Sequence, residues 1–360
     1  MELLNQQVAS SPFGHAEGSP LIYLLLASVC FILKVNMGRI FSVFLLIALI
    51  VGGFYFVKTE PSGLNSPIPK VFGITSNRQV NKRSFSTNKW FPKTAKTNFE
   101  SENLSLNLSA KSALVVDYDS GEIIFGKNIK QRLPIASTVK IMTALVALEN
   151  AKLKDTFLVS VKAAKVGENS MGLTAGEKLT LEELLYGLML VSGNDAAVTI
   201  AEGASKSEEA FVKLMNQTAA DLVLDDTKFI NASGLDEDGS NQYSSAYDLA
   251  VISRYVWENY PQLRQITSTV HEFIDANSDH KSFDLYNDTN LLTTYPGVKG
   301  IKPGFTWEAG LCLVTYAEND GKKLLAVILG SDDRRGEMKE LLDYGFAQYG
   351  VKVSHPALDL

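Results

Sequence analysis

The pair Ser137 and Lys140 is the part of this sequence best suited to nucleophilic catalysis. Both residues lie in the stretch 133–145, where a proline and a small polar residue precede apolar side chains at helical spacing. This pattern is typical of the start of a helix. Side chains three positions apart share one face of a helix, so the serine hydroxyl would lie beside the lysine amine. Because a hydroxyl becomes a good nucleophile when a neighbour takes its proton, the spacing predicts a serine nucleophile with a lysine base.

Lys140 can act as a base only if its pKa falls from about 10.4 towards neutrality, which disfavours the ammonium form by about 4 kcal/mol. Burial in an apolar helix and a second nearby cation can supply a shift of this size. A serine followed three residues later by a lysine also occurs by chance, mostly as a helix cap and a solvated lysine. The rest of the sequence therefore decides between these two interpretations.

Two further motifs follow the pair in the chain, Ser192-Gly193-Asn194 and Lys302-Pro303-Gly304. Taken alone, the first is explained as a helix cap in a loop and the second as a solvated lysine on a strand. In this order and spacing, the three motifs resemble the serine penicillin-binding proteins and β-lactamases, whose signatures are S-x-x-K, S-x-N and K-T-G. The greatest likeness is to the low-molecular-mass D-alanyl-D-alanine carboxypeptidases, and it runs from about residue 104 to 350. The flanking residues that share it are 141–144, 195–197, 290–292, 300–301 and 309–310.

The resemblance implies a role for each motif residue. Ser137 would attack the peptide carbonyl and become acylated, and Lys140 would act as the base. Ser192 would relay the proton to the leaving amine, and Asn194 would hold both a substrate carbonyl and Lys140. Lys302 would keep Lys140 short of protons and attract the terminal carboxylate of the substrate.

The residues that follow Lys302 are implied to bind the substrate, namely Gly304, Phe305 and Thr306. In the family the oxyanion is held by two backbone N–H groups, which here are those of Ser137 and Phe305. Water then hydrolyses the acyl-enzyme. The resemblance implies neither a metal nor a cofactor.

Pro303 departs from the family pattern, which usually has a threonine whose hydroxyl helps to hold the substrate carboxylate. Proline has no N–H, so within sheets it is confined to edges. The corresponding strand of the family is an edge strand, along which the substrate lies. We therefore expect an intact strand that has lost one contact with the substrate.

Strand and helix patterns divide the body of the chain. Strands are predicted at 112–118, 123–125, 298–304, 311–317 and 323–329. Helices are predicted from Ser137, from Pro261, and at 179–189, 197–204, 208–222, 244–258 and 338–349. Strands at both ends with helices between them predict an α+β fold. The resemblance implies the fold of the penicillin-binding proteins and β-lactamases, an antiparallel sheet flanked by helices.

Residues 40–57 form an uncharged apolar run that is long enough to cross a bilayer as a helix. Positive charge precedes the run, and a basic flank normally stays in the cytoplasm. We expect a single-pass signal-anchor in the cell membrane, with residues 1–39 in the cytoplasm and the rest outside. Cleavage near Gly52-Gly53 is the alternative. Because Met37 opens a complete signal-anchor, it is a second candidate for the initiator.

Residues 58–103 are rich in Pro, Ser, Thr and Asn and carry eight Lys or Arg against three Glu, which predicts a flexible basic linker. The body, 104–355, is acidic, and the whole chain has a formal net charge of −6. An acidic body on a basic tether argues against a nucleic-acid partner; the tether is a solvated linker or a surface for anionic lipid. Cys30 and Cys312 predict no disulfide, and the four scattered histidines form no metal-ligand pattern.

With the predicted anchor, the resemblance implies a membrane-anchored serine carboxypeptidase that removes the terminal D-alanine from peptidoglycan stem pentapeptides. It also implies a role in cell-wall synthesis and cell shape, and covalent inhibition by β-lactam antibiotics. One alternative is a β-lactamase or esterase, which would need an additional base; Glu168, Glu182 and Glu183 lie between the first two motifs without a convincing setting for it. The other is a non-catalytic or weakly active penicillin- or wall-binding protein, which Pro303 favours.

Overall fold

The structure is a computed structural model that describes residues 90–94, 106–236 and 242–355. The predicted cytoplasmic segment 1–39, the predicted anchor 40–57 and most of the predicted linker lie outside the described residues. Within the described part, no helix is both long and apolar enough to cross a membrane.

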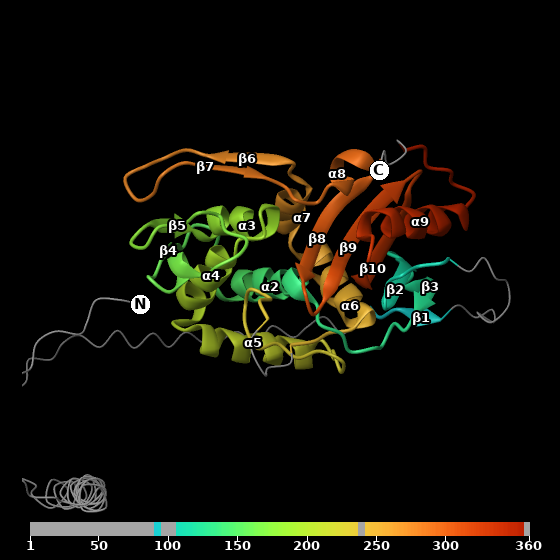
Figure 1. Cartoon of the computed structure of the whole chain (residues 1–360), viewed down its shortest axis with the longest axis horizontal. Coiled ribbons are helices and arrows are strands. Elements are labelled where there is room, and N and C mark those ends of the chain that lie inside the picture. The colour runs from blue at the N-terminus through green and yellow to red at the C-terminus, as the bar shows by residue number, and fades with distance from the viewer. Residues whose placement is uncertain (1–89, 95–105, 237–241, 356–360) are drawn as a thin grey trace, which may run out of the picture. The chain divides into compact units, whose positions relative to one another are not determined.

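The body is built around one six-stranded sheet (Figure 1). Its strands lie in the order β1-β3-β2-β10-β9-β8, and all neighbours are antiparallel except β1 and β3. Their bounds are β1 Lys93–Thr94, β2 Ser112–Asp117, β3 Glu122–Lys127, β8 Val298–Thr306, β9 Gly310–Asn319 and β10 Lys322–Ser331. The predicted α+β fold with an antiparallel sheet is confirmed, and the edge position predicted for the strand that carries Lys302 is observed.

The sheet joins the two ends of the body, because β2 pairs with β10 along its whole length. A two-residue turn, Asp320-Gly321, connects β9 to β10, and both residues have positive φ, 47° and 72°. This is the turn geometry that suits the twist of a hairpin, and Gly321 adopts it without a Cβ clash. The strands predicted at 311–317 and 323–329 are therefore joined as a hairpin.

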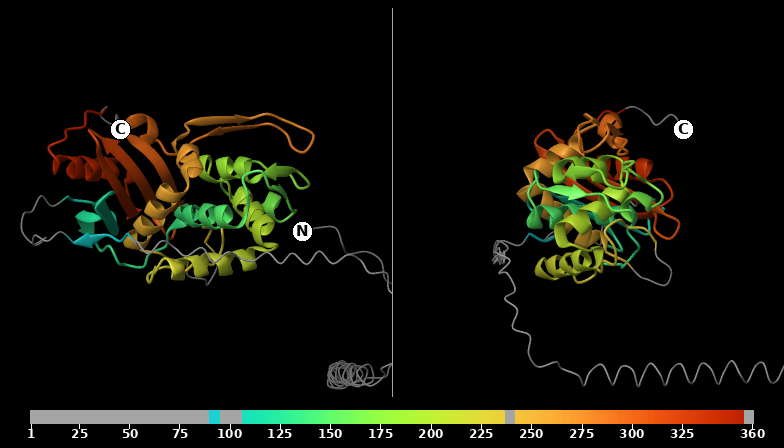
Figure 2. Two further views of the ribbon diagram at one scale, coloured as in Figure 1. Left: turned by 180° about the vertical axis from the view of Figure 1, so that it is seen from behind. Right: turned by 90° about the vertical axis from the view of Figure 1, so that its left-hand side faces the viewer.

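The two faces of the sheet bury different layers. Along β10, Leu325 and Val327 belong to the larger core, whereas Ala326 and Ile328 belong to a second core that includes the buried face of α9 (Arg334–Ala347). This alternation follows from the two-residue period of a strand. Figures 1 and 2 show α9 on one side of the sheet and α6 (Ala246–Asn259) on the other.

A helical region lies beside the sheet and shares the larger core (Figure 1). It contains η1 Ala136–Val139, α2 Lys140–Asn150, η2 Ala163–Lys165, α3 Leu181–Leu190, α4 Asn194–Ser205, α5 Glu208–Asp221 and α7 Pro261–Ser268. Two small sheets accompany it, β4 Thr156–Leu158 with β5 Lys178–Thr180, and β6 His271–Ile274 with β7 Phe283–Tyr286. A single-turn helix, α8 Leu291–Thr294, precedes β8.

Side-chain caps mark the starts of α6 and α3. Ser245 accepts a hydrogen bond from the Asp248 N–H at the start of α6. Helix α3 begins at Leu181 rather than at the predicted residue 179, because Lys178–Thr180 pair with β4. Thr180 then forms a capping box with Glu183.

Two strand segments were not predicted from the sequence. Lys93–Thr94 form β1 and pair with β3, although both residues lie inside the predicted linker 58–103. Part of that linker thus belongs to the sheet, and the folded body begins before residue 104. The second segment is the β6–β7 hairpin, which extends beside α3 (Figures 1 and 2).

Candidate active site

Ser137 lies on the turn η1, which leads directly into α2. The residue before it, Ala136, has a positive φ of 47°, an uncommon conformation for a non-glycine residue. Backbone strain of this kind clusters at functional sites. The predicted helix is confirmed, but its first turn is a 3-10 turn without a side-chain cap.

Lys140 is fully buried, and its amine Nζ meets three oxygens. Nζ lies 2.8 Å from the Ser137 Oγ and 2.8 Å from the Asn194 Oδ1. The third partner is the backbone carbonyl of Ser233. The structure therefore brings together the serine, the lysine and the asparagine of two separate motifs.

These partners determine how a neutral amine is oriented. The oxygens of Asn194 and Ser233 belong to carbonyl groups, which only accept hydrogen bonds, so they take two N–H groups of Nζ. The orientation of the Asn194 amide is fixed because its Nδ2 donates to the Gly167 carbonyl at 3.0 Å. The lone pair of a neutral Lys140 then faces the Ser137 hydroxyl and can accept its proton.

Burial is the main cause that lowers the pKa of Lys140 well below its ordinary value. The positive charge of Lys302 lowers it further, whereas the carboxylates of Asp288, Asp195 and Glu168 act in the opposite direction. Both causes anticipated from the sequence, burial and a second cation, are thus present. They favour the free amine that a lysine base needs.

Ser192 comes close to this group without bonding to it. Its φ is +58°, and its Oγ is buried without a hydrogen-bond partner among the residues that the structure describes. Gly193, the next residue, donates its N–H to the Gly187 carbonyl and caps α4. The strained turn therefore presents a free hydroxyl in the same cavity as Ser137 and Asn194.

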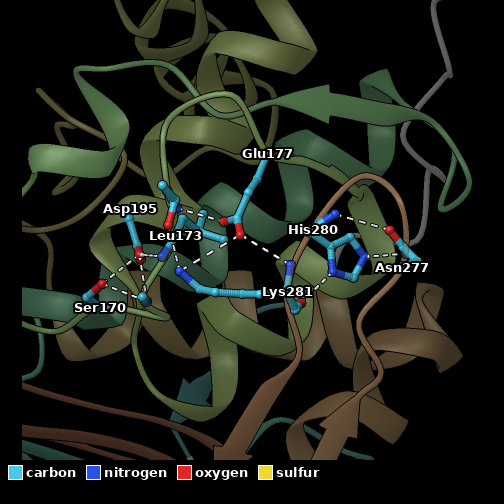
Figure 3. Close-up of polar contacts among 9 residues, drawn as sticks. Ser170, Leu173, Glu177, Asp195, Asn277, His280 and Lys281 are labelled. Carbon is cyan, nitrogen blue, oxygen red and sulfur yellow. Dashed lines mark hydrogen bonds and ion pairs between the residues drawn. The ribbon is translucent and has the colours of Figure 1, made fainter.

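One wall of this cavity is a loop, 167–177, that Asp195 anchors (Figure 3). Asp195 accepts bonds from the Ser170 hydroxyl and from the N–H groups of the next three residues, at 2.6 to 2.9 Å. Further along, Glu177 accepts from the backbone N–H of Lys281 in the β6–β7 hairpin at 3.3 Å (Figure 3). The wall is thus tied both to α4 and to the hairpin.

The opposite wall is the edge strand β8. A Cβ at Gly304 would lie 3.0 Å from the Ser137 backbone N, so only glycine lets the strand approach the nucleophile this closely. Phe305 is 47% exposed at the cavity, and the Thr306 hydroxyl accepts from the Ala309 N–H at 3.1 Å. Pro303 stands opposite Leu313 of β9 and leaves the strand unbroken, as expected for an edge position.

Lys302 is fully buried in β8, and its Nζ has no hydrogen-bond partner within the described residues. It forms an ion pair with the Asp288 carboxylate, whose Oδ1 lies 3.6 Å from Nζ. Burial lowers the pKa of Lys302, Asp288 opposes that shift, and Arg334 adds to it. The cation predicted for this strand is therefore present beside Lys140, but it faces an acidic residue that the sequence had not singled out.

The cavity between the two walls has a volume of about 340 Å³, which is the size of a small-ligand site. Its lining combines predicted residues with unpredicted ones, namely Ser137, Glu168, Asn169, Ser192, Asn194, Asp236, Asp288, Pro303, Gly304, Phe305, Thr306, Trp307 and Arg334. Within residues 90–94, 106–236 and 242–355, no group of three or more His, Cys, Asp or Glu side chains is arranged to hold a metal ion.

Three contributors to the site were missed. Arg334 lines the cavity and donates from Nη1 to the Gly304 carbonyl at 2.8 Å, although in the sequence it resembles a surface arginine. Ser233 contributes a backbone carbonyl, which residue type does not reveal. Asp288 lies two residues before the stretch 290–292 that supported the resemblance, and that position was the only available signal.

Comparisons with known proteins agree with this geometry. A family model described as D-alanyl-D-alanine carboxypeptidase matches residues 96–333. The D-alanyl-D-alanine carboxypeptidase DacF of Bacillus subtilis is 39% identical over 255 residues, which cover 69% of this chain and 64% of that protein, just under two thirds of its length.

Solved structures resemble the body as well. A D-alanyl-D-alanine carboxypeptidase from Mycobacterium tuberculosis superposes with a TM-score of 0.65 at 31% identity, covering 73% of this chain and 100% of that one. Penicillin-binding protein D2 of Listeria monocytogenes, solved in an ampicillin-bound form, gives a TM-score of 0.58 at 28% identity, with coverages of 68% and 100%.

Proposed function

Since this chain belongs to the D-alanyl-D-alanine carboxypeptidase family, we propose that it is a serine peptidase that removes the C-terminal D-alanine from peptidoglycan stem pentapeptides. The single observation that carries the proposal is the Lys140 amine, buried and 2.8 Å from both the Ser137 Oγ and the Asn194 Oδ1. A free lysine amine in that place is the base that a serine nucleophile requires.

In the acylation step the Ser137 Oγ attacks the carbonyl carbon of the bond between the two D-alanines, and Lys140 takes the hydroxyl proton. The backbone N–H groups of Ser137 and Phe305 hold the oxyanion. The close approach of Gly304 to the Ser137 backbone supports this placement, because it brings the two N–H-bearing segments together. Expulsion of D-alanine needs a proton on the leaving amine, and the free hydroxyl of Ser192 is the group proposed to relay it.

Deacylation reverses the roles of these groups. A water molecule attacks the acyl carbon, Lys140 accepts its proton, and the Ser137 oxygen leaves with that proton. The peptide product is one D-alanine shorter, and the enzyme returns to its starting state. Asn194 holds Lys140 in both steps through its Oδ1.

The terminal carboxylate of the substrate is proposed to bind at the β8 wall. Lys302 supplies positive charge from its buried position in β8. Arg334 supplies a guanidinium that lines the cavity. Gly304, Phe305 and Thr306 line the path of the substrate along the strand edge. Pro303 brings no hydroxyl to this wall, so we expect weaker binding of the carboxylate rather than loss of activity.

Release of D-alanine from diacetyl-Lys-D-Ala-D-Ala tests the proposal. The wild-type protein is expected to release D-alanine and Ser137→Ala is expected to release none, while a labelled penicillin acylates the wild type alone. Acylation by penicillin without D-alanine release would instead identify a penicillin-binding protein that does not trim peptides. Rapid turnover of the penicillin would identify a β-lactamase.

We also propose that residues 40–57 anchor the body to the cell membrane as a single-pass helix, with the body outside the cytoplasm. The support is the sequence alone, an apolar run after basic residues. N-terminal sequencing of the native protein tests the proposal together with the role of Met37. A peptide from residues before Met37 would exclude that start, and recovery of the whole protein in the soluble fraction would exclude the anchor.

A further inference from the structure

Asp288 is an acidic side chain at the point where the substrate carboxylate should bind. It comes two residues after β7, and its backbone N–H donates to the Leu190 carbonyl at 3.0 Å, so its main chain is fixed against the end of α3. Its carboxylate lines the cavity together with Ser137 and Arg334. The protein therefore places a negative charge in the part of the cavity that must also accept the negatively charged carboxylate of the substrate.

The partner of this carboxylate is Lys302. The Lys302 side chain has no exposed surface, whereas the Asp288 side chain is 34% exposed. Asp288 lines the cavity and Lys302 does not. The anion that faces the buried Lys302 ammonium from the cavity is therefore the Asp288 carboxylate, a group of the protein and not of a ligand.

The contact between Asp288 and Lys302 differs from the structural carboxylates of this protein. Asp195 accepts four hydrogen bonds from loop 167–177, at 2.6 to 2.9 Å. The Asp288 Oδ1 accepts none from the described residues and lies 3.6 Å from the Lys302 Nζ, beyond hydrogen-bond distance. The two atoms form an ion pair that is longer than a hydrogen bond, so each can still form a bond with a third group.

On the basis of the proposed function, we propose that Asp288 is an internal counterion that competes with the substrate carboxylate for Lys302. It thereby sets how strongly the cavity prefers ligands with a free terminal carboxylate over ligands whose terminus is neutral. Arg334 remains available to the ligand, and the missing hydroxyl at Pro303 weakens carboxylate binding in the same direction. The site then prefers ligands with a free terminal carboxylate less strongly than Lys302 and Arg334 would without Asp288.

The charges around the cavity support this assignment. Asp288 acts to raise the pKa of Lys302, of Arg334 and of Lys140, in each case against the lowering effect of burial. The other carboxylates that act to raise the pKa of Lys140 are those of Asp195 and Glu168. Asp195 is hydrogen-bonded to loop 167–177, and Glu168 is exposed. Asp288 is thus the carboxylate that acts on all three cations.

The test compares two ligands that differ in one charge, benzylpenicillin and its neutral methyl ester. The measured quantity is the ratio of their second-order rate constants for acylating Ser137. This ratio cancels any change in the fraction of folded enzyme and any change in the reactivity of Ser137. It is measured from acidic to neutral pH, because a lysine is most fully protonated at the acidic end of that range.

Asp288→Asn removes the charge at nearly constant volume. We expect the ratio of benzylpenicillin to methyl ester to rise about fivefold, because Lys302 loses a partly exposed ion-pair partner that competes with the ligand carboxylate. Asp288→Glu keeps the charge and should restore the wild-type ratio. Asp284→Asn is the matched control: it removes an exposed carboxylate from the same hairpin and should leave the ratio unchanged. An unchanged ratio in Asp288→Asn would overturn the proposal, and a lower ratio would show that Asp288 supports carboxylate binding instead.

The experiment separates this inference from the proposed function. If no D-alanine is released from diacetyl-Lys-D-Ala-D-Ala while the penicillin ratio changes as expected, peptide trimming fails and the role of Asp288 stands. If D-alanine is released and the ratio is the same in wild type and Asp288→Asn, the role of Asp288 fails and trimming stands. Failure of both penicillins to acylate the wild type would contradict both.

Discussion

The two walls of the cavity differ in how completely their polar groups are paired. The helical wall comprises η1, α2, the start of α4 and the loop 167–177. There Lys140 has three oxygen partners, and both ends of the Asn194 amide are hydrogen-bonded. The Ser192 hydroxyl, proposed as the proton relay, is the exception on this wall. On the β8 wall, the Lys302 Nζ and the facing Asp288 Oδ1 have no hydrogen bond within the described residues. Trp307, at the rim of that wall, is 94% exposed.

This difference separates two tasks of the site. Proton transfer requires groups that are held in place before the substrate arrives, because reorganisation during the reaction costs activation free energy. Substrate binding requires groups whose partners are supplied by the ligand. We infer that the helical wall is assembled for chemistry, whereas the β8 wall is completed by the ligand, and the following predictions test that division.

The largest effect is expected from Lys140→Met, which keeps the length of the side chain and removes the base. Acylation of Ser137 by benzylpenicillin should fall by about 10²–10⁴-fold, the usual contribution of a general base. Stopped-flow measurement of acylation checks this prediction, with Lys152→Met as the control at an exposed lysine. If Lys140→Met acylates at the wild-type rate, the base is another group.

A smaller effect is expected from Asn194→Leu on the same wall. The change leaves the Lys140 Nζ and the Gly167 carbonyl each short of a partner, so the free energy of unfolding should fall by about 1–3 kcal/mol. Acylation should fall as well, because Nζ loses one of the bonds that orient it. Urea unfolding and acylation kinetics check the two effects, and Asn259→Leu on α6 is the control. Loss of stability with unchanged acylation would remove Asn194 from the catalytic group.

Lys302→Gln tests whether the β8 wall acts on the helical wall through charge. The Lys302 ammonium lowers the pKa of Lys140, so its removal should raise that pKa. The rate constant with the neutral penicillin ester should then begin to rise at higher pH than in the wild type. A pH profile that stays in place would show that Lys302 serves ligand binding alone.

The smallest effect is expected from Pro303→Thr on the β8 wall. The added hydroxyl can donate to the ligand carboxylate, and one net hydrogen bond of roughly 0.5–1.5 kcal/mol corresponds to about two- to twelvefold tighter binding. KM for diacetyl-Lys-D-Ala-D-Ala should fall while kcat changes little. Pro303→Ala separates the hydroxyl from the removal of proline, and an equal gain in both variants would contradict this explanation.

The sequence predicted best the parts whose information is local. The long strands β9 and β10 and the hairpin turn Asp320-Gly321 follow from apolar runs and from a turn type that these residues favour. The motif residues Ser137, Lys140, Asn194 and Lys302 were found because their types and order are distinctive. Their convergence then followed from the resemblance, and the structure places them around one site.

The parts that could not be predicted depend on contacts between distant segments. The carbonyl of Ser233 reaches Lys140 across 93 positions, and a backbone group leaves no mark in residue type. Arginine and aspartate are residue types that usually lie on the surface. The place of Arg334 and Asp288 in the site is therefore seen only from their contacts with β8. The strands β6 and β7 have four residues each, which is the shortest run from which a two-residue alternation can be recognised.

The central claim is that the pKa of Lys140 is held well below its ordinary value, so that its free amine takes the Ser137 proton. The most direct measurement is the pH dependence of the rate constant for acylation of wild-type Ser137 by the penicillin methyl ester, a ligand that lacks an ionisable carboxylate. We predict that the rate constant reaches its plateau well below the ordinary lysine pKa of about 10.4. A rate constant that keeps rising until the pH passes that value would contradict the claim.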